Sequence, residues 1–358
     1  EAPGLNYYFA QMKAASYHRF GGEITIGQVA DPPVPEDAAL IEVRATGICR
    51  SDWYGWQGYD ADITLPHVPG HEWAGLVLEV GSQVQQWKAG NRVTAPFICA
   101  CGACPQCHAG DQQVCAQQTQ PGFTHWGSFA EYVVVRQADI NLVGLPETMS
   151  FVEAASLGCR FGTAYRAVTA QAHLKPGEWL LVLGCGGVGL SAIQIAQALD
   201  IRTIAVDIDP EKLALASRLG ATSVINGSEA TSLPDAVAEL TDGGAHASMD
   251  ALGHPQLIAD GILSVRKRGR HVQVGLMEGD HREPRIPMPR VIADEIEIVG
   301  SHGIQAHRYP EMFRLIEDKH IAVSQLISDT VSLSQGIKIL QSMNFNPPKG
   351  IAVINNFN

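Results

Sequence analysis

The 358-residue chain has no apolar run long enough to cross a membrane as a helix. Its longest runs, such as residues 179–183, have strand length and fall far short of the ~20 residues that span a bilayer. Basic residues are also scarce, because 25 lysines and arginines face 37 acidic side chains and the net charge is −12. Nucleic-acid binding depends on clustered lysine and arginine. We therefore expect neither a membrane nor a nucleic acid as a partner.

Internal repeats, low-complexity segments and a basic-then-apolar leader are absent as well. With 46% hydrophobic residues, the composition excludes a disordered or fibrous protein. At ~150 residues per domain, the length suggests two domains. Residues 1–11 precede the first methionine, Met12, and show no helical or strand periodicity. We expect them to be an extension or a cloning remnant.

Cysteine, in contrast, is present eight times, and four of the eight fall within residues 101–115. An even count in a short secreted chain would suggest disulfides, but this chain is long and shows no leader. Metal binding in a reducing compartment explains the clustering better. A cytoplasmic location is therefore expected.

The hydrophobic pattern changes near residue 160. Before it, short strand-like runs at 39–44, 75–80 and 130–135 are broken by glycine and proline, which predicts an antiparallel, barrel-like β region. After it, strands alternate with helices, as in a doubly wound α/β fold with a parallel sheet. The expected strands are 179–183, 202–207, 222–225, 246–251, 270–275 and 296–300, and the expected helices include 187–199, 210–219 and 255–265.

The tail after residue 300 shows helical patterns at 307–320 and 333–343 and a last strand at 350–355. By pattern alone it could pair with either domain.

A glycine motif follows the first of the later strands. Residues 180–183 run directly into Gly184, Gly186 and Gly189, with Gly187 and Val188 between them, and a helical pattern follows. Such glycines permit the tight turn, the close approach of a pyrophosphate and the packing of helix on strand. The plain alternative is a tight connection without a ligand.

Asp207 supplies the second half of that fingerprint, because it ends the next strand eighteen residues beyond Gly189. A carboxylate there accepts hydrogen bonds from the adenosine ribose and repels a 2′-phosphate, which favours NAD over NADP. The alternative is a solvated strand-end acid or a helix cap. Asp209, which precedes Pro210, is the better cap and leaves Asp207 for the ribose.

Four cysteines form the pattern C-x2-C-x2-C-x7-C: Cys101, Cys104, Cys107 and Cys115. Four thiolates in one loop can close a tetrahedral zinc site with no open position, so the expected role is structural. An iron–sulfur cluster is the competing interpretation. Cys99 lies just outside the run and is not expected to be a ligand.

Three other segments carry residue types that can ligate a metal, and each segment alone is weak evidence for a metal site. They contain Cys49, His71 with Glu72, and Cys159. Together Cys49, His71 and Cys159 make a Cys2His set, which leaves a fourth zinc position open.

From Met12 onward, the sequence resembles the zinc-dependent medium-chain alcohol dehydrogenases, which are themselves the standard example of the Cys2His set. The motifs occur in the family's order: Gly47-Ile-Cys-Arg-Ser-Asp52, Pro69-Gly-His-Glu72, the four-cysteine lobe, Cys159, the glycine loop and Asp207. The resemblance implies a GroES-like β-rich catalytic domain over 12–160 with a structural zinc lobe at 99–116. It also implies an NAD-binding Rossmann domain over 161–299 and a return of 300–358 to the catalytic domain.

The resemblance further implies two zinc ions per chain, reversible hydride transfer between a small-molecule alcohol and NAD, and a dimeric or tetrameric homo-oligomer. In it, Cys49, His71 and Cys159 correspond to catalytic zinc ligands. The resemblance also implies that Glu72 is an acid beside the metal, which can transiently replace water as a ligand, and that Asp52 supports His71. Ser51 would relay the proton, and Arg50 and Lys212 would bind the cofactor. Phe97 and Trp53 would line the substrate pocket.

One position departs from the family pattern. Tyr54 stands where many relatives carry a histidine, three residues after Ser51, and a tyrosine hydroxyl is a poor base near pH 7. We therefore expect proton release through cofactor ribose and water, with an alkaline optimum.

Aromatic residues near the motifs predict a mostly apolar substrate pocket suited to aliphatic, cyclic or aromatic alcohols: Trp53, Trp56, Tyr59, Phe97, Phe123 and Trp126. The alternative for each of them is core packing. The alternatives for the whole protein are a polyol-type or other zinc dehydrogenase, a quinone reductase of the same fold, and a non-catalytic zinc- and nucleotide-binding protein.

Overall fold

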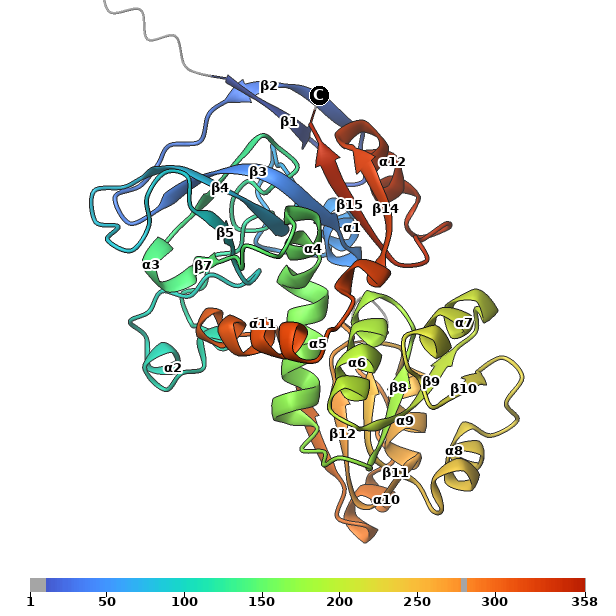
Figure 1. Ribbon diagram of the computed structural model, residues 1–358. Helices are drawn as coiled ribbons and strands as arrows, with labels where there is room; N and C mark the ends of the chain where they lie inside the picture. The colour runs from blue at the N-terminus through green and yellow to red at the C-terminus, as the bar shows by residue number, and fades with distance from the viewer. Residues whose placement is uncertain (1–10, 278–281, 358) are drawn as a thin grey trace, which may run out of the picture. The chain divides into compact units, whose positions relative to one another are not determined.

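The computed structural model describes residues 11–277 and 282–357 (Figure 1). By their internal contacts the residues form two units, and each is described by itself. Unit 1 comprises Glu1–Gly158, Asp329–Pro347 and Ala352–Asn358, and unit 2 comprises Cys159–Ser328 and Pro348–Ile351. Of the predicted N-terminal extension, residues 1–10 lie outside the described residues, whereas Gln11 already begins the first strand.

Unit 1 is built on an antiparallel sheet around the long strand β3 (Ala39–Ile48), which pairs with three other strands. The sheet has seven strands, the others being β4 (Glu72–Val80), β5 (Arg92–Thr94), β6 (Tyr132–Val135), β7 (Val143–Gly144), β14 (Ile327–Ser332) and β15 (Ile351–Asn356). Two more strands, β1 (Gln11–Tyr17) and β2 (Ile24–Ala30), form a separate hairpin. The helices of this unit are α1 (Arg50–Gln57), α2 (Pro105–His108), α3 (Ala138–Asn141), α4 (Phe151–Ala155) and α12 (Leu333–Ser342).

The sheet of unit 1 follows from side-chain alternation. Ile41 and Val43 point from β3 into a core that also contains Val77 and Val93. Because side chains of a strand alternate between its faces, this spacing fixes the register of β3 on β4. The predicted antiparallel β region is therefore confirmed.

Unit 2 contains a six-stranded parallel sheet with the order β10-β9-β8-β11-β12-β13. Its strands are β8 (Trp179–Leu183), β9 (Arg202–Asp207), β10 (Ser223–Asn226), β11 (Ala245–Asp250), β12 (Val265–Gln273) and β13 (Glu297–Gly300). In chain order this is 3-2-1-4-5-6, the doubly wound dinucleotide-binding arrangement. Every residue of β8 is buried, as a central parallel strand requires.

The helices of unit 2 are α5 (Gly162–Arg166), α6 (Gly187–Ala198), α7 (Pro210–Arg218), α8 (Leu233–Thr241), α9 (Pro255–Leu263), α10 (Met288–Ala293) and α11 (Tyr309–Asp318), of which α6 to α9 pack on the sheet. The C-terminal segment divides at a point that its pattern did not indicate. Residues 300–328 group with unit 2, so the return to unit 1 that was predicted from residue 300 runs from Asp329.

Among the described residues, no helix combines the length and the hydropathy that a membrane span would need.

Candidate functional site

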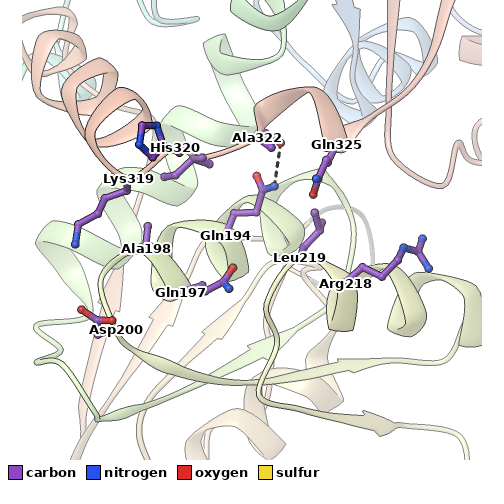
Figure 2. Close-up of a pocket in the computed structure, with 11 residues that line it drawn as sticks. Gln194, Gln197, Ala198, Asp200, Arg218, Leu219, Lys319, His320, Ala322 and Gln325 are labelled. Carbon is purple, nitrogen blue, oxygen red and sulfur yellow. Dashed lines mark hydrogen bonds between the residues drawn. The ribbon is translucent and has the colours of Figure 1, made fainter.

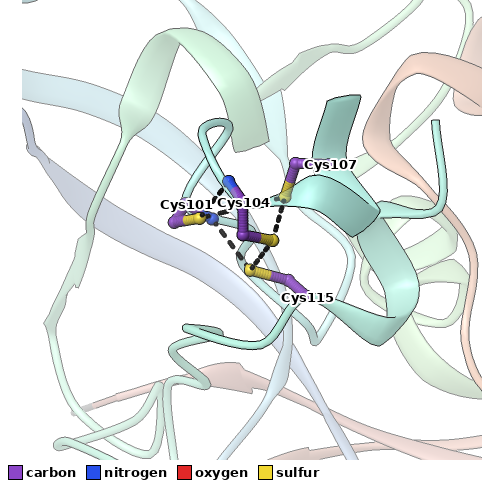
Figure 3. A group of neighbouring side chains, drawn as sticks. All are labelled: Cys101, Cys104, Cys107 and Cys115. Atoms are coloured by element: carbon purple, nitrogen blue, oxygen red, sulfur yellow. Dashed lines mark hydrogen bonds between the residues drawn. The ribbon is translucent and has the colours of Figure 1, made fainter. Parts of the chain in front are cut away.

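The four lobe cysteines converge on one point (Figure 3). Their sulfur atoms are 3.9 Å apart for Cys101 and Cys107, 3.4 Å for Cys104 and Cys107, and 3.7 Å for Cys104 and Cys115. A tetrahedral ion with Zn–S bonds of ~2.3 Å places its sulfurs about 3.8 Å apart. The donor set and its spacing therefore fit a closed structural zinc site.

Backbone N–H groups favour the thiolate form of two of these sulfurs, those of Cys101 and Cys104, whereas burial raises the pKa of the Cys107 and Cys115 thiols. The N–H groups of Ala103 and Cys104 donate to the Cys101 sulfur, each at 3.4 Å. The N–H of Cys107 donates to the Cys104 sulfur and lowers the pKa of that thiol to about 6. A thiolate is the form that binds metal.

Asn141 holds the lobe to the rest of unit 1. Its side-chain oxygen accepts from the Ala100 N–H at 2.7 Å, and its amide nitrogen donates to the Ala100 carbonyl at 3.0 Å. Asn141 is 1% exposed. This role could not be predicted from the sequence, because a single asparagine in a short helical segment belongs to no recognisable motif.

The three residues of the second ligand set also lie close together in the structure. One ligand atom each from Cys49, His71 and Cys159 lies within 4.8 Å of the other two. Cys49 follows β3 directly, and His71 directly precedes β4, so their pairing strands bring them together. Cys159 is one peptide bond beyond Gly158, the last residue of this run of unit 1, in the π-helical segment Leu157–Phe161. Gly158 itself lies against the residue after His71, since an added Cβ would be 3.4 Å from the Cα of Glu72.

Asp52 orients His71. The Nδ1 atom of His71 lies 2.8 Å from Oδ1 of Asp52, and both residues are 1% exposed. The same carboxylate accepts the N–H of Cys49 at 2.9 Å and that of Gly70 at 3.1 Å. Burial opposes charging of His71, but the Asp52 charge prevails and raises the pKa of the imidazole. This contact is the one that the predicted support of His71 by Asp52 requires, and the role itself stays a prediction.

The other nitrogen of His71 identifies a metal position. Its Nε2 atom is buried and has no hydrogen-bond partner. A buried polar atom without a partner is costly, and an imidazole held at Nδ1 by a carboxylate is the usual arrangement of a zinc-bound histidine. The two thiols and this nitrogen therefore fit a three-ligand zinc site.

Gly70 gives the backbone just before His71 a conformation that favours glycine. Its φ of +107° is in the region that favours glycine, and an added Cβ would lie 2.7 Å from the Phe129 nitrogen. Glu72, the first residue of β4, is fully buried.

Aromatic rings flank the imidazole. The ring of Phe123 is 5.3 Å from that of His71 and the ring of Phe97 is 6.2 Å away, and both are nearly buried. Phe97 was predicted to line the substrate pocket, and Phe123 was among the candidate aromatics. Trp56 instead packs in the unit 1 core and donates to the Gly22 carbonyl.

The remaining residues of the Cys49 segment lie on α1. Ser51 is half-buried in the first turn of the helix. Arg50 lies over the Trp53 ring at 5.3 Å and donates to Asn344 at 3.4 Å. Trp53 also packs against the core cluster of unit 1, so its role as a pocket residue stays a prediction.

The glycine loop of unit 2 connects β8 to α6 with each glycine in a distinct role. Gly184 has a φ of +94°, and a Cβ on Gly189 would lie 1.9 Å from the Gly184 carbonyl. A Cβ on Gly187 would meet the Arg160 side chain at 2.5 Å. Gly186 is exposed at the helix N-terminus and faces open space. A phosphate can therefore approach the first N–H groups of α6, near Val188.

Asp207 ends β9 beside this loop. Its carboxylate accepts the N–H of Cys185 at 2.8 Å, of Ile208 at 2.8 Å and of Asp209 at 3.0 Å. The carboxylate of Asp207 therefore also ties the loop to the strand, and its role in binding the ribose stays a prediction. A carboxylate has about four acceptor positions, so a ribose hydroxyl can still bind. Asp209 caps α7 as predicted, accepting from Glu211 at 2.9 Å.

Two cysteines take no part in either ligand set. Cys99 and Cys185 are buried, and burial raises the pKa of each thiol to about 12. For Cys185 the Asp207 charge raises the pKa further, and the Lys212 charge opposes this increase.

Known proteins share this architecture. The family models of the alcohol dehydrogenase GroES-like domain and of the zinc-binding dehydrogenase match residues 35–147 and 187–318. An alcohol dehydrogenase of Geobacillus stearothermophilus is 34% identical over 294 residues, which cover 81% of this chain and 84% of that protein. The chain belongs to the zinc-dependent medium-chain alcohol dehydrogenase family.

Two further relatives of this dehydrogenase agree. The sorbitol dehydrogenase of Bacillus subtilis is 32% identical over 332 residues, covering 90% of this chain and 91% of that one. The solved structure of the alcohol dehydrogenase TADH from Thermus sp. ATN1 matches with a TM-score of 0.87 and 27% identity over 97% of this chain and 100% of that one. The fold and the zinc-dependent alcohol dehydrogenase function predicted from the sequence are confirmed.

Proposed function

We propose that this dehydrogenase reversibly oxidises a primary or secondary alcohol to an aldehyde or ketone with NAD as the hydride acceptor. One observation carries the proposal: the unpartnered Nε2 of His71 lies with the thiols of Cys49 and Cys159, next to the rings of Phe97 and Phe123. Three ligands leave a fourth position for the substrate oxygen. The two rings favour an apolar aliphatic, cyclic or aromatic substituent.

The ligand residues and their neighbours have distinct roles in the proposal. Cys49, His71 and Cys159 would hold the zinc, and the Asp52 carboxylate would keep the His71 Nδ1 protonated so that Nε2 can ligate. Zinc, when bound, supplies Lewis-acid polarisation of the substrate oxygen. Glu72 provides a buried carboxylate next to His71 in the chain.

In this proposal the proton of the alcohol leaves through the hydroxyl group of Ser51. Its position in the first turn of α1, two residues after Cys49, puts a hydroxyl next to the ligand segment. Tyr54, on the same helix, contacts the rings of Trp53 and Tyr59. Since no histidine follows Ser51 in this helix, we propose final release through the cofactor ribose and water.

The glycine loop and Asp207 hold the dinucleotide. The exposed N-terminus of α6 offers N–H groups to the pyrophosphate, and the carboxylate of Asp207 accepts a ribose hydroxyl. Lys212 and Arg50 supply positive charge that the chain as a whole lacks. A 2′-phosphate would meet the Asp207 charge, which supports NAD over NADP.

A polyol-type dehydrogenase is the second candidate, because the sorbitol dehydrogenase of B. subtilis is a relative over most of the chain. The apolar rings of Phe97 and Phe123 favour the simple alcohol.

A panel of primary, secondary, cyclic and aromatic alcohols and of polyols, each assayed with NAD+ and NADP+, tests the proposal. We expect kcat/KM to be roughly tenfold or more higher for apolar alcohols than for polyols, and for NAD+ than for NADP+. Faster turnover of polyols would support the second candidate. Equal rates with both cofactors would contradict the role of Asp207.

The cytoplasmic location and the dimeric or tetrameric state are likewise proposals, supported by the thiol ligands and by the family. Light scattering of the purified protein tests the second.

A further inference from the structure

Unit 2 contains a pocket that neither zinc site nor the glycine loop uses. Its volume is about 440 Å³, within the range of small-molecule sites. It lies where three helices end, since α6, α7 and α11 end at Ala198, Arg218 and Asp318 (Figure 2). The lining residues are Gln194, Gln197, Ala198, Asp200, Arg218, Leu219, Lys319, His320, Ile321, Ala322 and Gln325.

Gln194 gives the pocket an unused acceptor. Its side chain is 6% exposed, and its amide nitrogen donates to the Ala322 carbonyl at 3.1 Å. That bond fixes the orientation of the amide, and the buried Oε1 has no hydrogen-bond partner. A buried acceptor without a partner costs free energy, so the site favours a molecule with an O–H or N–H group.

Two more amides surround it. Gln197 and Gln325 are exposed at the pocket rim, and an added Cβ on Gly220 would lie 2.1 Å from Gln197 Oε1, so this amide packs closely on the α7 end. Amides offer both donors and acceptors, which suits a molecule with several hydroxyl groups. Leu219 is buried and gives the pocket an apolar side chain.

The charge of the rim differs from that of the whole chain. Arg218, Lys319 and His320 line the pocket against one acid, Asp200, whereas the chain carries a net charge of −12. Figure 2 shows Arg218 and Lys319 on opposite sides of the glutamine amides. Basic residues near helix C-termini stabilise those ends, yet here they also border a pocket with an unused acceptor.

We propose that this pocket binds a small polyhydroxylated anion of the sugar-phosphate class. A hydroxyl donates to Gln194 Oε1, other hydroxyls bind the amides of Gln197 and Gln325, and Arg218 or Lys319 binds the phosphate. The residues of this pocket are different from the catalytic residues. The proposal therefore does not depend on which alcohol the enzyme oxidises.

Isothermal titration calorimetry of the zinc-loaded enzyme with ribose 5-phosphate, ribose or inorganic phosphate tests the proposal. We expect ribose 5-phosphate to bind, and each fragment to bind at least roughly tenfold more weakly. Amide hydrogen exchange should slow at residues 194–200 and 318–325. Equal affinity for inorganic phosphate and for ribose 5-phosphate would mean that the pocket binds an adventitious ion only. The proposal would also be overturned if ribose 5-phosphate did not bind, or if it slowed exchange at other residues instead.

Three variants localise the binding. Gln194→Met removes the acceptor and Lys319→Ala removes a rim charge, so each should weaken ribose 5-phosphate by roughly tenfold while alcohol turnover stays unchanged. Lys338→Ala removes an equally exposed charge on α12 and should bind like the unmodified chain. If Gln194→Met fails to fold, the comparison of Lys319→Ala with Lys338→Ala decides, and equal affinity of those two contradicts the site.

Discussion

Asp52 contacts both unit 1 ligands of the catalytic set. It accepts from the Cys49 backbone at 2.9 Å and lies 2.8 Å from the His71 ring nitrogen. Asp52→Asn keeps the size but removes the charge and can present an N–H to Nδ1, which disfavours the ligating tautomer. We expect a loss of roughly 10- to 100-fold in zinc affinity or turnover, measured by chelator competition and steady-state kinetics.

The lobe provides the internal comparison for this variant. The hydrogen bonds of Asp52 involve Cys49, Gly70 and His71, so the zinc of the four-cysteine lobe should stay bound. Asp62→Asn changes an exposed acid ten residues away and should leave both properties unaltered. Normal turnover of Asp52→Asn would contradict its role.

Tyr54 carries the prediction about proton release. An imidazole at this position can accept a proton near neutral pH, whereas a phenol is a poor base there. Tyr54→His should therefore move the pH optimum of alcohol oxidation from alkaline toward neutral pH. The measurement is the pH dependence of kcat and kcat/KM, and an unchanged profile counts against release through ribose and water.

At this scale the sequence predicted the ligands but not all their supports. Cys49, His71 and Asp52 stand in short motifs with a chemical reason for each residue type. Asn141 and Gly70 are as important to the geometry, but their roles depend on contacts with Ala100 and Phe129 that only the folded chain brings together.

The element that binds the dinucleotide offers a matched pair of glycine variants. Gly186 faces open space with φ −81° and ψ −170°, which alanine adopts without strain, so Gly186→Ala should fold normally. Its methyl group occupies the approach of the pyrophosphate, and the Kd for NADH should rise by roughly tenfold or more.

Gly189 behaves differently, because a Cβ there would lie 1.9 Å from the Gly184 carbonyl. Gly189→Ala should separate α6 from β8 and lower the stability of unit 2 by about 1–3 kcal/mol, measured by thermal or urea unfolding. If Gly186→Ala also unfolded, or bound NADH normally, the assigned roles of the two glycines would fail.

The lobe is the second element with a matched pair. Cys104→Ser removes one of four ligands, so the chain should lose one zinc and unfold at a lower temperature. Cys99→Ala lies near the lobe but outside the ligand set, and both zinc ions should remain. Zinc content by atomic emission and the Tm of each variant give the answer; a full zinc complement in Cys104→Ser would contradict a four-cysteine site.

Helices and strands could be predicted from the sequence where a run of consecutive residues is buried. Strands 179–183 and 202–207 coincide with β8 and β9, because β8 is apolar and buried throughout and β9 has four consecutive buried residues, Thr203 to Val206. β12 begins at Val265, five residues before the predicted start, because Arg266, Lys267 and Arg268 conceal the strand. β14 was missed altogether, since its six residues are exposed or half-buried and show no alternation.

For the whole molecule, composition gave the two units but not their exact limits. The return of the tail to unit 1 begins at Asp329, because α11 packs with α5 in unit 2 and no local pattern in the sequence encodes that choice. The acidic net charge also has a consequence at this scale. We therefore expect the cofactor phosphates to rely on the α6 N-terminus and on individual basic residues, for which Lys212 and Arg50 are proposed, rather than on the field of the whole protein.

The most direct test of the central claim is the zinc content of the purified chain, measured together with alcohol-dependent NAD+ reduction. We expect two zinc ions per chain, one at each cysteine-containing set, and loss of turnover when a chelator removes the one at Cys49, His71 and Cys159. Cys159→Ser should keep one zinc and lose turnover. One zinc per chain in the unmodified protein, or alcohol oxidation that a chelator leaves intact, would contradict the account.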